Sequence, residues 1–136
     1  MKHLLPIILL VCLAGCASSN PQGRVPISGE VLLNGQPLKE GNVEFSSVAG
    51  STPMMMTSAT IKNGKFETTA ADGLIPGQTY TVKFSATEEI AGEFNVAPNG
   101  EKTPLTKDII PPQWGHESKE TITCEKGKEN KFDFKL

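Results

Sequence analysis

Among the residues that could carry chemistry, Cys16 has the most informative surroundings. A cysteine thiolate is a nucleophile, and this one follows the uncharged stretch LLPIILLVCLAG at residues 4–15. That stretch is shorter than the ~20 apolar residues that span a bilayer. It fits the ~7–15 apolar residues of a signal-peptide hydrophobic region, and Lys2 and His3 supply the weakly basic start. Residues 1–15 are therefore predicted to be an export signal.

The four residues Leu13-Ala14-Gly15-Cys16 resemble the lipobox of bacterial lipoproteins. The resemblance implies that the signal peptidase recognises Leu13, Ala14 and Gly15, and that the Cys16 thiol accepts diacylglycerol as a thioether. It also implies anchoring on the extracytoplasmic face of the cell membrane or outer membrane. Ala17 stands where an Asp tends to retain such proteins at the inner membrane, which favours the outer one. Each buried CH₂ contributes ~0.8 kcal/mol, so two or three acyl chains would hold the mature chain firmly.

Four other features could suggest catalysis or metal binding, but for His116 and Asp72 the partner groups are missing, and for Cys124 and the methionines packing is the better explanation. His116 lies in QWGHES, without a nucleophile or metal ligands beside it on the same face of the chain. Cys124 shares an apolar face with Ile122, so we expect it in the core. Asp72 is the single carboxylate of AADGL, too few for a calcium loop. The side chains of the three adjacent methionines Met54–Met56 cannot all point to the same side of a strand, which disfavours a copper site. The sequence predicts no metal, no cofactor and no catalytic activity.

Trp114 and Tyr80 are the candidate ligand-contacting residues, because two aromatic rings can form a platform for a small ligand or a carbohydrate. The more ordinary expectation is that Trp114 fills the end of a sandwich. The net charge of −2 gives no basic excess of the kind that nucleic-acid binding requires.

The 136 residues divide into three segments. Residues 1–15 are the predicted signal peptide, and residues 16–24 carry the lipidated cysteine and a flexible polar tether. Residues 25–136 are one predicted domain. Once Cys16 is modified, Cys124 has no partner within the mature chain, so this domain depends on its apolar core.

Alternating apolar and polar residues predict about seven strands and no helix. The clearest are residues 27–33, 42–48, 54–61 and 79–86, and residues 120–136 are predicted to form a closing hairpin that turns at Lys126-Gly127. Asn34-Gly35 and Asn63-Gly64 favour tight hairpin turns. Residues 91–107 are predicted to be a long loop with one edge strand around Phe94. One apolar face per strand indicates antiparallel sheets packed as a β-sandwich.

The pattern of turns and faces over residues 27–136 resembles small lipoproteins of planctomycete-type bacteria that carry a transthyretin-like, or carboxypeptidase regulatory-like, domain. The resemblance lies in GEVLLNGQPLKEGNVEF, in NGKF, in PGQTYTV and in the ending GKENKFDFKL. Trp114 stands where a tyrosine is usual. The resemblance implies a transthyretin-like sandwich and carries no defined activity.

Together these patterns predict an extracytoplasmic, membrane-anchored lipoprotein with a non-catalytic β-sandwich. Its expected role is structural or protein-interacting at the cell envelope, with an envelope protein or polysaccharide as partner. The alternatives are a carrier of a small ligand or carbohydrate, whose pocket would include Trp114 or Tyr80, and a hydrolase or metalloenzyme built around His116.

Overall fold

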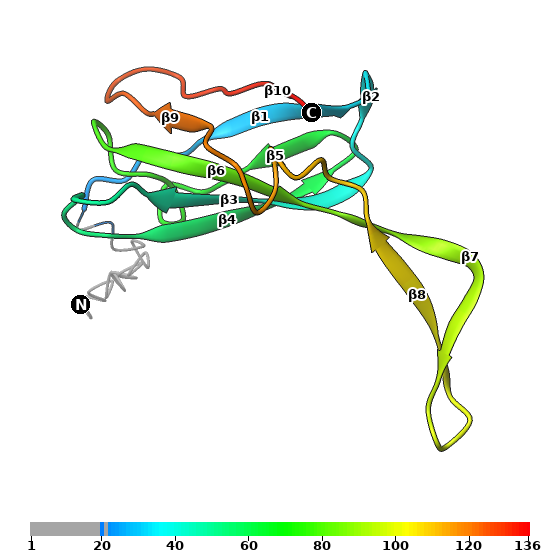
Figure 1. Cartoon of the computed structure of the whole chain (residues 1–136). Helices are drawn as coiled ribbons and strands as arrows, with labels where there is room; N and C mark the ends of the chain where they lie inside the picture. The colour runs from blue at the N-terminus through cyan, green and yellow to red at the C-terminus, as the bar shows by residue number, and fades with distance from the viewer. Residues whose placement is uncertain (1–19, 21) are drawn as a thin grey trace, which may run out of the picture.

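The computed structural model describes residues 20 and 22–136, and within them the chain is all β. The ten strands are β1 Ser28–Leu33, β2 Gln36–Pro37, β3 Glu40–Ser47, β4 Met56–Lys62, β5 Lys65–Glu67, β6 Thr79–Ser85, β7 Thr87–Val96, β8 Lys102–Asp108, β9 Thr121–Thr123 and β10 Phe134–Lys135 (Figure 1). The described residues contain no helix that could cross a membrane. The prediction of an all-β chain is confirmed.

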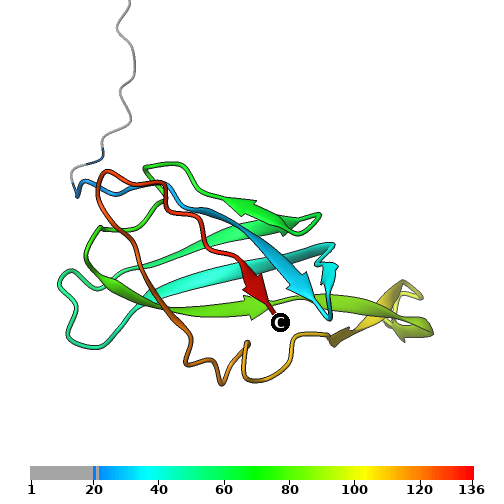
Figure 2. The ribbon, with the colours of Figure 1, turned by 90° about the horizontal axis from the view of Figure 1, so that it is seen from above.

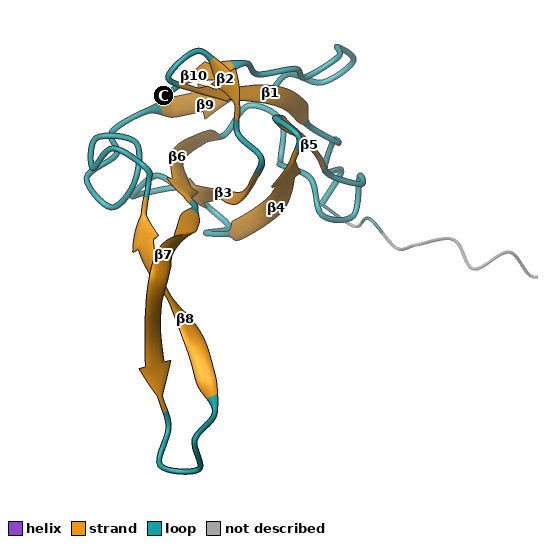
Figure 3. Ribbon diagram, turned by 90° about the vertical axis from the view of Figure 1, so that its right-hand side faces the viewer, coloured by secondary structure: helices purple, strands orange, loops and turns teal. Residues whose placement is uncertain are grey.

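Eight strands form one hydrogen-bonded sheet in the order β10-β1-β5-β4-β3-β6-β9, with β2 paired to β1. The pairs are antiparallel except β1 with β10. Seen from the side, the sheet curls so that β10, β1 and β5 lie across from β3, β4 and β6, and β9 returns toward the side of β10 and β1 (Figure 3). The result is the predicted sandwich, but its two layers are joined at one corner by the single residue pair Lys62–Lys65 between β4 and β5.

The two predicted Asn-Gly turns are both present. Asn34 and Gly35 have φ values of 52° and 80°, and Asn63 and Gly64 have 50° and 74°. Two consecutive positive φ angles define the hairpin turn whose twist matches that of the flanking strands, and Asn and Gly adopt it most easily. The turns fix the β1–β2 and β4–β5 hairpins.

The core forms from the inward row of each strand, as the alternation predicted. On β6, Tyr80, Val82 and Phe84 are buried between the less buried Thr81 and Lys83. The same pattern repeats on the neighbouring strands. The largest fully buried side chains are Tyr80, Phe45, Ile27, Ile61, Leu74, Val31, Val43, Val82 and Cys124.

Aromatic rings connect the two layers. The Phe84 ring centroid lies 5.0 Å from that of Phe134 and 6.0 Å from that of Trp114, both in edge-to-face arrangement. Phe66 contacts Phe134 at 6.3 Å and Phe45 at 5.9 Å. Such pairs add to the apolar area that each ring buries.

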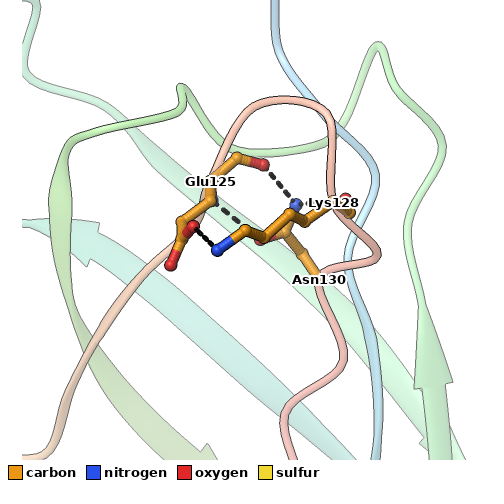
Figure 4. Close-up of polar contacts among 3 residues, drawn as sticks. All are labelled: Glu125, Lys128 and Asn130. Carbon is orange, nitrogen blue, oxygen red and sulfur yellow. Dashed lines mark hydrogen bonds and ion pairs between the residues drawn. The ribbon is translucent and has the colours of Figure 1, made fainter.

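Residues 120–136 do not form the predicted closing hairpin. β9 pairs with β6 and β10 pairs in parallel with β1, so the two strands lie at opposite ends of the sheet order. The loop between them is held by the buried Asn130 (Figure 4). Its amide accepts from Glu125 N–H at 2.8 Å and donates to Glu125 O at 2.9 Å and Lys128 O at 3.2 Å.

The prediction of a long loop over residues 91–107 is also wrong. These residues belong to a two-stranded hairpin of β7 and β8, which pair only with each other and project from the sandwich (Figure 1). Neither face of the hairpin is buried, so the alternation of apolar and polar residues that marks a half-buried strand is missing there. We call residues 87–108 the arm.

Glycine at position 29 on β1 lets the main chain of Phe132 and the Phe66 ring approach β1 more closely than any side chain would allow. A Cβ at Gly29 would lie 1.8 Å from Phe132 O and 2.6 Å from Cε1 of the Phe66 ring. The Phe132 N–H donates to Ser28 O at 2.9 Å, which fixes this main chain against β1.

We predict that Gly29→Ala lowers the free energy of unfolding by about 2–4 kcal/mol, because the main chain of residue 132 must move. The matched control is Gly115→Ala, since the nearest atom to a Cβ there is 3.6 Å away, an ordinary contact. Urea denaturation of both variants measures the difference. Equal losses in the two variants would contradict the close packing at Gly29.

Candidate functional site

The predicted lipidation site Cys16 and the recognition residues Leu13, Ala14 and Gly15 lie outside the described residues. The described part of the predicted tether is tied to the domain. The Arg24 guanidinium donates to Ala71 O at 2.9 Å and to the side chain of Gln22, and the Asn20 amide bonds the main chain of Arg24 at both its N–H and its carbonyl. The chain therefore enters the sandwich along the loop that precedes Leu74.

Tyr80 is a core residue in this structure. Its side chain is fully buried, and its hydroxyl accepts from Ile75 N–H at 3.0 Å and lies within hydrogen-bonding distance of Gln78 Oε1 and Met55 Sδ. Burial raises the pKa of the phenol above its ordinary value of 10.0. Tyr80 therefore presents no face to a ligand.

Trp114 is half-buried and lies far from Tyr80. It packs edge-on against Phe84, which is four residues beyond Tyr80 on β6, or about 13 Å at ~3.3 Å per residue. The two aromatic side chains do not form a common platform. Trp114 does line an open cavity of about 700 Å³ together with Gln113, Glu117, Lys119 and Glu120.

Cys124 and the methionines are placed as packing predicted. The Cys124 thiol is buried and lies 3.4 Å from Ile75 O, and burial raises its pKa above 9.0. His116 is exposed, and its ion-pair contact is with the neighbouring Glu117 at 3.6 Å. Met55 packs against the core, whereas Met54 and Met56 are exposed. Within residues 20 and 22–136, no three His, Cys, Asp or Glu side chains gather in a way that could hold a metal ion.

The arm is the candidate functional site that the sequence analysis missed. It exposes two of the four large apolar side chains that the described part of the chain presents to solvent, Phe94 at 49% and Val96 at 63%. Phe94 is paired across the hairpin with Pro104, and Val96 with Lys102, so these four side chains share one face. The opposite face at this level carries Asn95 and Thr103. The arm thus has one partly apolar and one polar face.

The arm also differs in charge from the sandwich. It contains five carboxylates, Glu88, Glu89, Glu93, Glu101 and Asp108, and two lysines, Lys102 and Lys107, which gives −3. The rest of the chain from residue 20 has ten basic and ten acidic side chains, which gives zero. Lys107 and Glu88 form an exposed ion pair across the arm at 2.8 Å. The excess negative charge of residues 20–136 therefore lies on the arm.

One local signal in the sequence did mark the arm. Pro98-Asn99-Gly100 stands between the two strands, and Gly100 has a φ of 83°. The Ala97 N–H donates to Glu101 O at 2.9 Å, which closes the turn. A third Asn-Gly pair is the same hairpin signal that correctly predicted the other two turns.

Comparisons with known proteins add no identification. No protein-family model and no characterised protein matches the sequence. Among solved structures, the chain is similar to a 9R-lipoxygenase from Cyanothece PCC8801, with 13% sequence identity and a TM-score of 0.34. That match covers 100% of this chain and 18% of the lipoxygenase chain, so this chain spans less than a fifth of that protein.

The raised pKa values of Tyr80 and Cys124 predict a loss of stability in alkali. The folded chain holds both protons at pH values where the unfolded chain releases them, so the free energy of unfolding falls as the pH rises above about 9. Urea denaturation at pH 7.0 and at about pH 9.5 measures the fall, which we expect to be smaller in Cys124→Ala because that variant lacks one of the two groups.

The same burial predicts that, in a Cys12→Ser, Cys16→Ser background, a thiol reagent labels Cys124 only after denaturant is added. An identical pH dependence in Cys124→Ala, or rapid labelling of the folded chain, would contradict the buried position.

Proposed function

We propose that this protein is a lipid-anchored, extracytoplasmic lipoprotein whose transthyretin-like sandwich acts as a non-catalytic interaction module at the cell envelope. The observation that supports the interaction role is the arm. An isolated two-stranded hairpin is at best marginally stable in water, yet this one exposes Phe94 and Val96 and packs on no other strand. Exposed apolar side chains on a projecting element are typical of a contact surface.

The position of the arm agrees with this role. Residues 22–25 lie at one end of the sandwich, and the arm projects from the other end (Figure 2). A tether of eight residues, 17–24, spans at most about 28 Å. With Cys16 held in a membrane, the arm would be the part of the domain farthest from the lipid. It would face an envelope protein or polysaccharide rather than the anchoring membrane.

One observation favours the alternative, a carrier of a small ligand or carbohydrate. Trp114 lines an open cavity of about 700 Å³ whose other members are polar or charged. A half-buried indole among such groups can stack on an apolar ligand face. Substitution of Trp114 therefore separates the two proposals, because the arm does not depend on it.

If Cys16 carries the lipid anchor, replacing this cysteine should move the protein from a detergent phase to the aqueous phase. The full chain, expressed in a bacterium that processes lipoproteins, should partition into the detergent phase of Triton X-114, and Cys16→Ser should partition into the aqueous phase. Cys124→Ala is the matched control and should partition like the unaltered chain. Intact-mass measurement of a mature chain without acyl groups would contradict the anchor.

Contact through the apolar face of the arm predicts a side-dependent cross-link. A photo-crosslinking amino acid placed at Phe94 or Val96 in cells should give a discrete adduct with one envelope component, and the same amino acid at Asn95 or Thr103 should give none. Phe94→Ser should remove the adduct seen from position 96 and change the free energy of unfolding by less than about 1 kcal/mol, because Phe94 is half exposed. Equal cross-linking from both faces would contradict a specific contact.

A further inference from the structure

The corner that joins the two layers leaves a groove between β4 and β5. The two strands are connected by the Asn63–Gly64 turn, but they pair only at Lys62 and Lys65. Beyond that pair, β4 continues beside β3 and β5 continues beside β1, as the side view shows (Figure 3). The groove has a volume of about 770 Å³, within the range of known ligand sites.

The main chain of β4 that lines this groove has no partner strand. The Met55 carbonyl accepts a hydrogen bond from β3 at 2.9 Å, and the Asn63 N–H donates to the residue before β3 at 2.8 Å. Main-chain groups alternate in direction along a strand, so the odd-numbered residues of β4 bond β3. The N–H and C=O groups of Ser58 and Thr60 are therefore directed away from β3 and into the groove.

The opposite wall has the same property. The Thr68 N–H donates to Ile27 O at 2.9 Å, so the even-numbered residues here bond the β1 side. The main-chain groups of Glu67 and Thr69 are then directed toward β4, and both residues line the groove. Both walls thus offer main-chain donors and acceptors that the two strands do not supply to each other, which is the arrangement that accepts an added strand.

The side chains along the open part of the β4 wall do not protect it, because the lysine of this strand, Lys62, stands only at the turn end. Ser58 and Thr60 are small and uncharged, whereas exposed edges are commonly guarded by Lys or Pro. The bottom of the groove includes the buried apolar side chains of Ala59 and Phe66. A segment with alternating residues could place every second side chain against them.

Charge is unevenly distributed along the groove. At the turn, Lys62 and Lys65 lie directly opposite each other, and each also has a glutamate opposite it on its other side, Glu40 on β3 and Glu30 on β1. In the part of the chain that the structure describes, neither lysine forms an ion pair. Farther along, the carboxylates of Glu67 and Asp72 line the groove, and Glu129 and Lys131 add one charge of each sign. The cationic side chains that β4 and β5 themselves contribute to the groove are thus at the turn end, which is where an acidic residue of a bound segment would be placed best.

We propose that this groove binds one extended peptide segment by strand addition along β4, with an acidic residue of that segment at Lys62 and Lys65. A single strand is favoured over a second copy of this chain, because the wall of residues 67–69 would collide with a second sheet edge. The proposed site is separate from the arm and does not require the lipid anchor. It goes beyond the proposed function and can fail independently of it.

Hydrogen exchange of the mature chain without peptide tests the open wall. The amides of Ser58 and Thr60 should exchange much faster than those of Ala59 and Ile61, which bond β3. Equal protection of all four amides would show that the groove is closed, and the proposal would be wrong.

Peptide selection tests the ligand. A displayed library of random octapeptides is selected on the purified full chain, and enriched peptides are measured by fluorescence anisotropy. They should carry an Asp or Glu at one end, and Ser58→Pro or Thr60→Pro should weaken their binding at least about tenfold, because each removes one main-chain donor. The double variant Lys62→Glu, Lys65→Glu should weaken it by a similar factor.

The matched control is Thr121→Pro on β9. Because Glu120 O accepts from the β6 residue Val82 N–H at 2.9 Å, the even-numbered residues of β9 bond β6. The Thr121 N–H therefore faces away from β6, as the Ser58 and Thr60 N–H groups face away from β3. This variant should bind the peptides unchanged. Circular dichroism checks that each variant is folded. If a proline variant does not fold, the peptide affinity of the Lys62→Glu, Lys65→Glu variant tests the proposal instead. Failure to enrich any peptide, or binding that survives in the folded β4 variants, overturns the proposal.

Discussion

Burial of a single row of side chains on each strand forces the sheet to turn back on itself at Asn63–Gly64. The rows of β3 and β6, with Phe45 and Phe84, are covered only when β1, β5 and β10 fold over them. The aromatic contacts of Phe66 and Phe134 with these two rings close that arrangement. Each strand beyond the corner belongs wholly to one layer, so β4 and β5 separate and the groove between them follows from the way the core closes.

The arm has a different physical basis from the sandwich. Its strands bury almost nothing, and it depends on its own ladder, its turn and an exposed ion pair that contributes little. The sandwich is electrically balanced, whereas the arm has an excess of three carboxylates. A molecule built this way can change the sequence of the arm without disturbing the core, which is the usual situation of a contact element. The proposed interaction role uses the arm, and the proposed peptide site uses main-chain groups of the sandwich.

The sequence predicted the burial of side chains such as Cys124 correctly, because burial follows from the local alternation along a strand. It did less well on which side chains lie together, because that depends on how distant segments pack. The alternation of apolar residues placed Cys124 in the core and showed that only a part of Met54–Met56 could point inward. It could not show that Trp114 lies far from Tyr80. The position of Trp114 depends on the loop before β9, which folds back so that Trp114 packs on Phe84, at the other end of β6 from Tyr80. The lipobox and transthyretin-like resemblances remain predictions.

The sequence by itself determined the all-β class, the inward rows of the main strands and the turns at Asn34–Gly35 and Asn63–Gly64. Each of these depends on residues that are close in the chain, through the alternation of a strand or the positive φ that Asn and Gly tolerate. Only the tertiary structure decided that β9 and β10 lie at opposite ends of the sheet, that residues 87–108 project as an arm and that β4 and β5 part. These features depend on which distant strands pair, and that choice is made by the packing of the whole core.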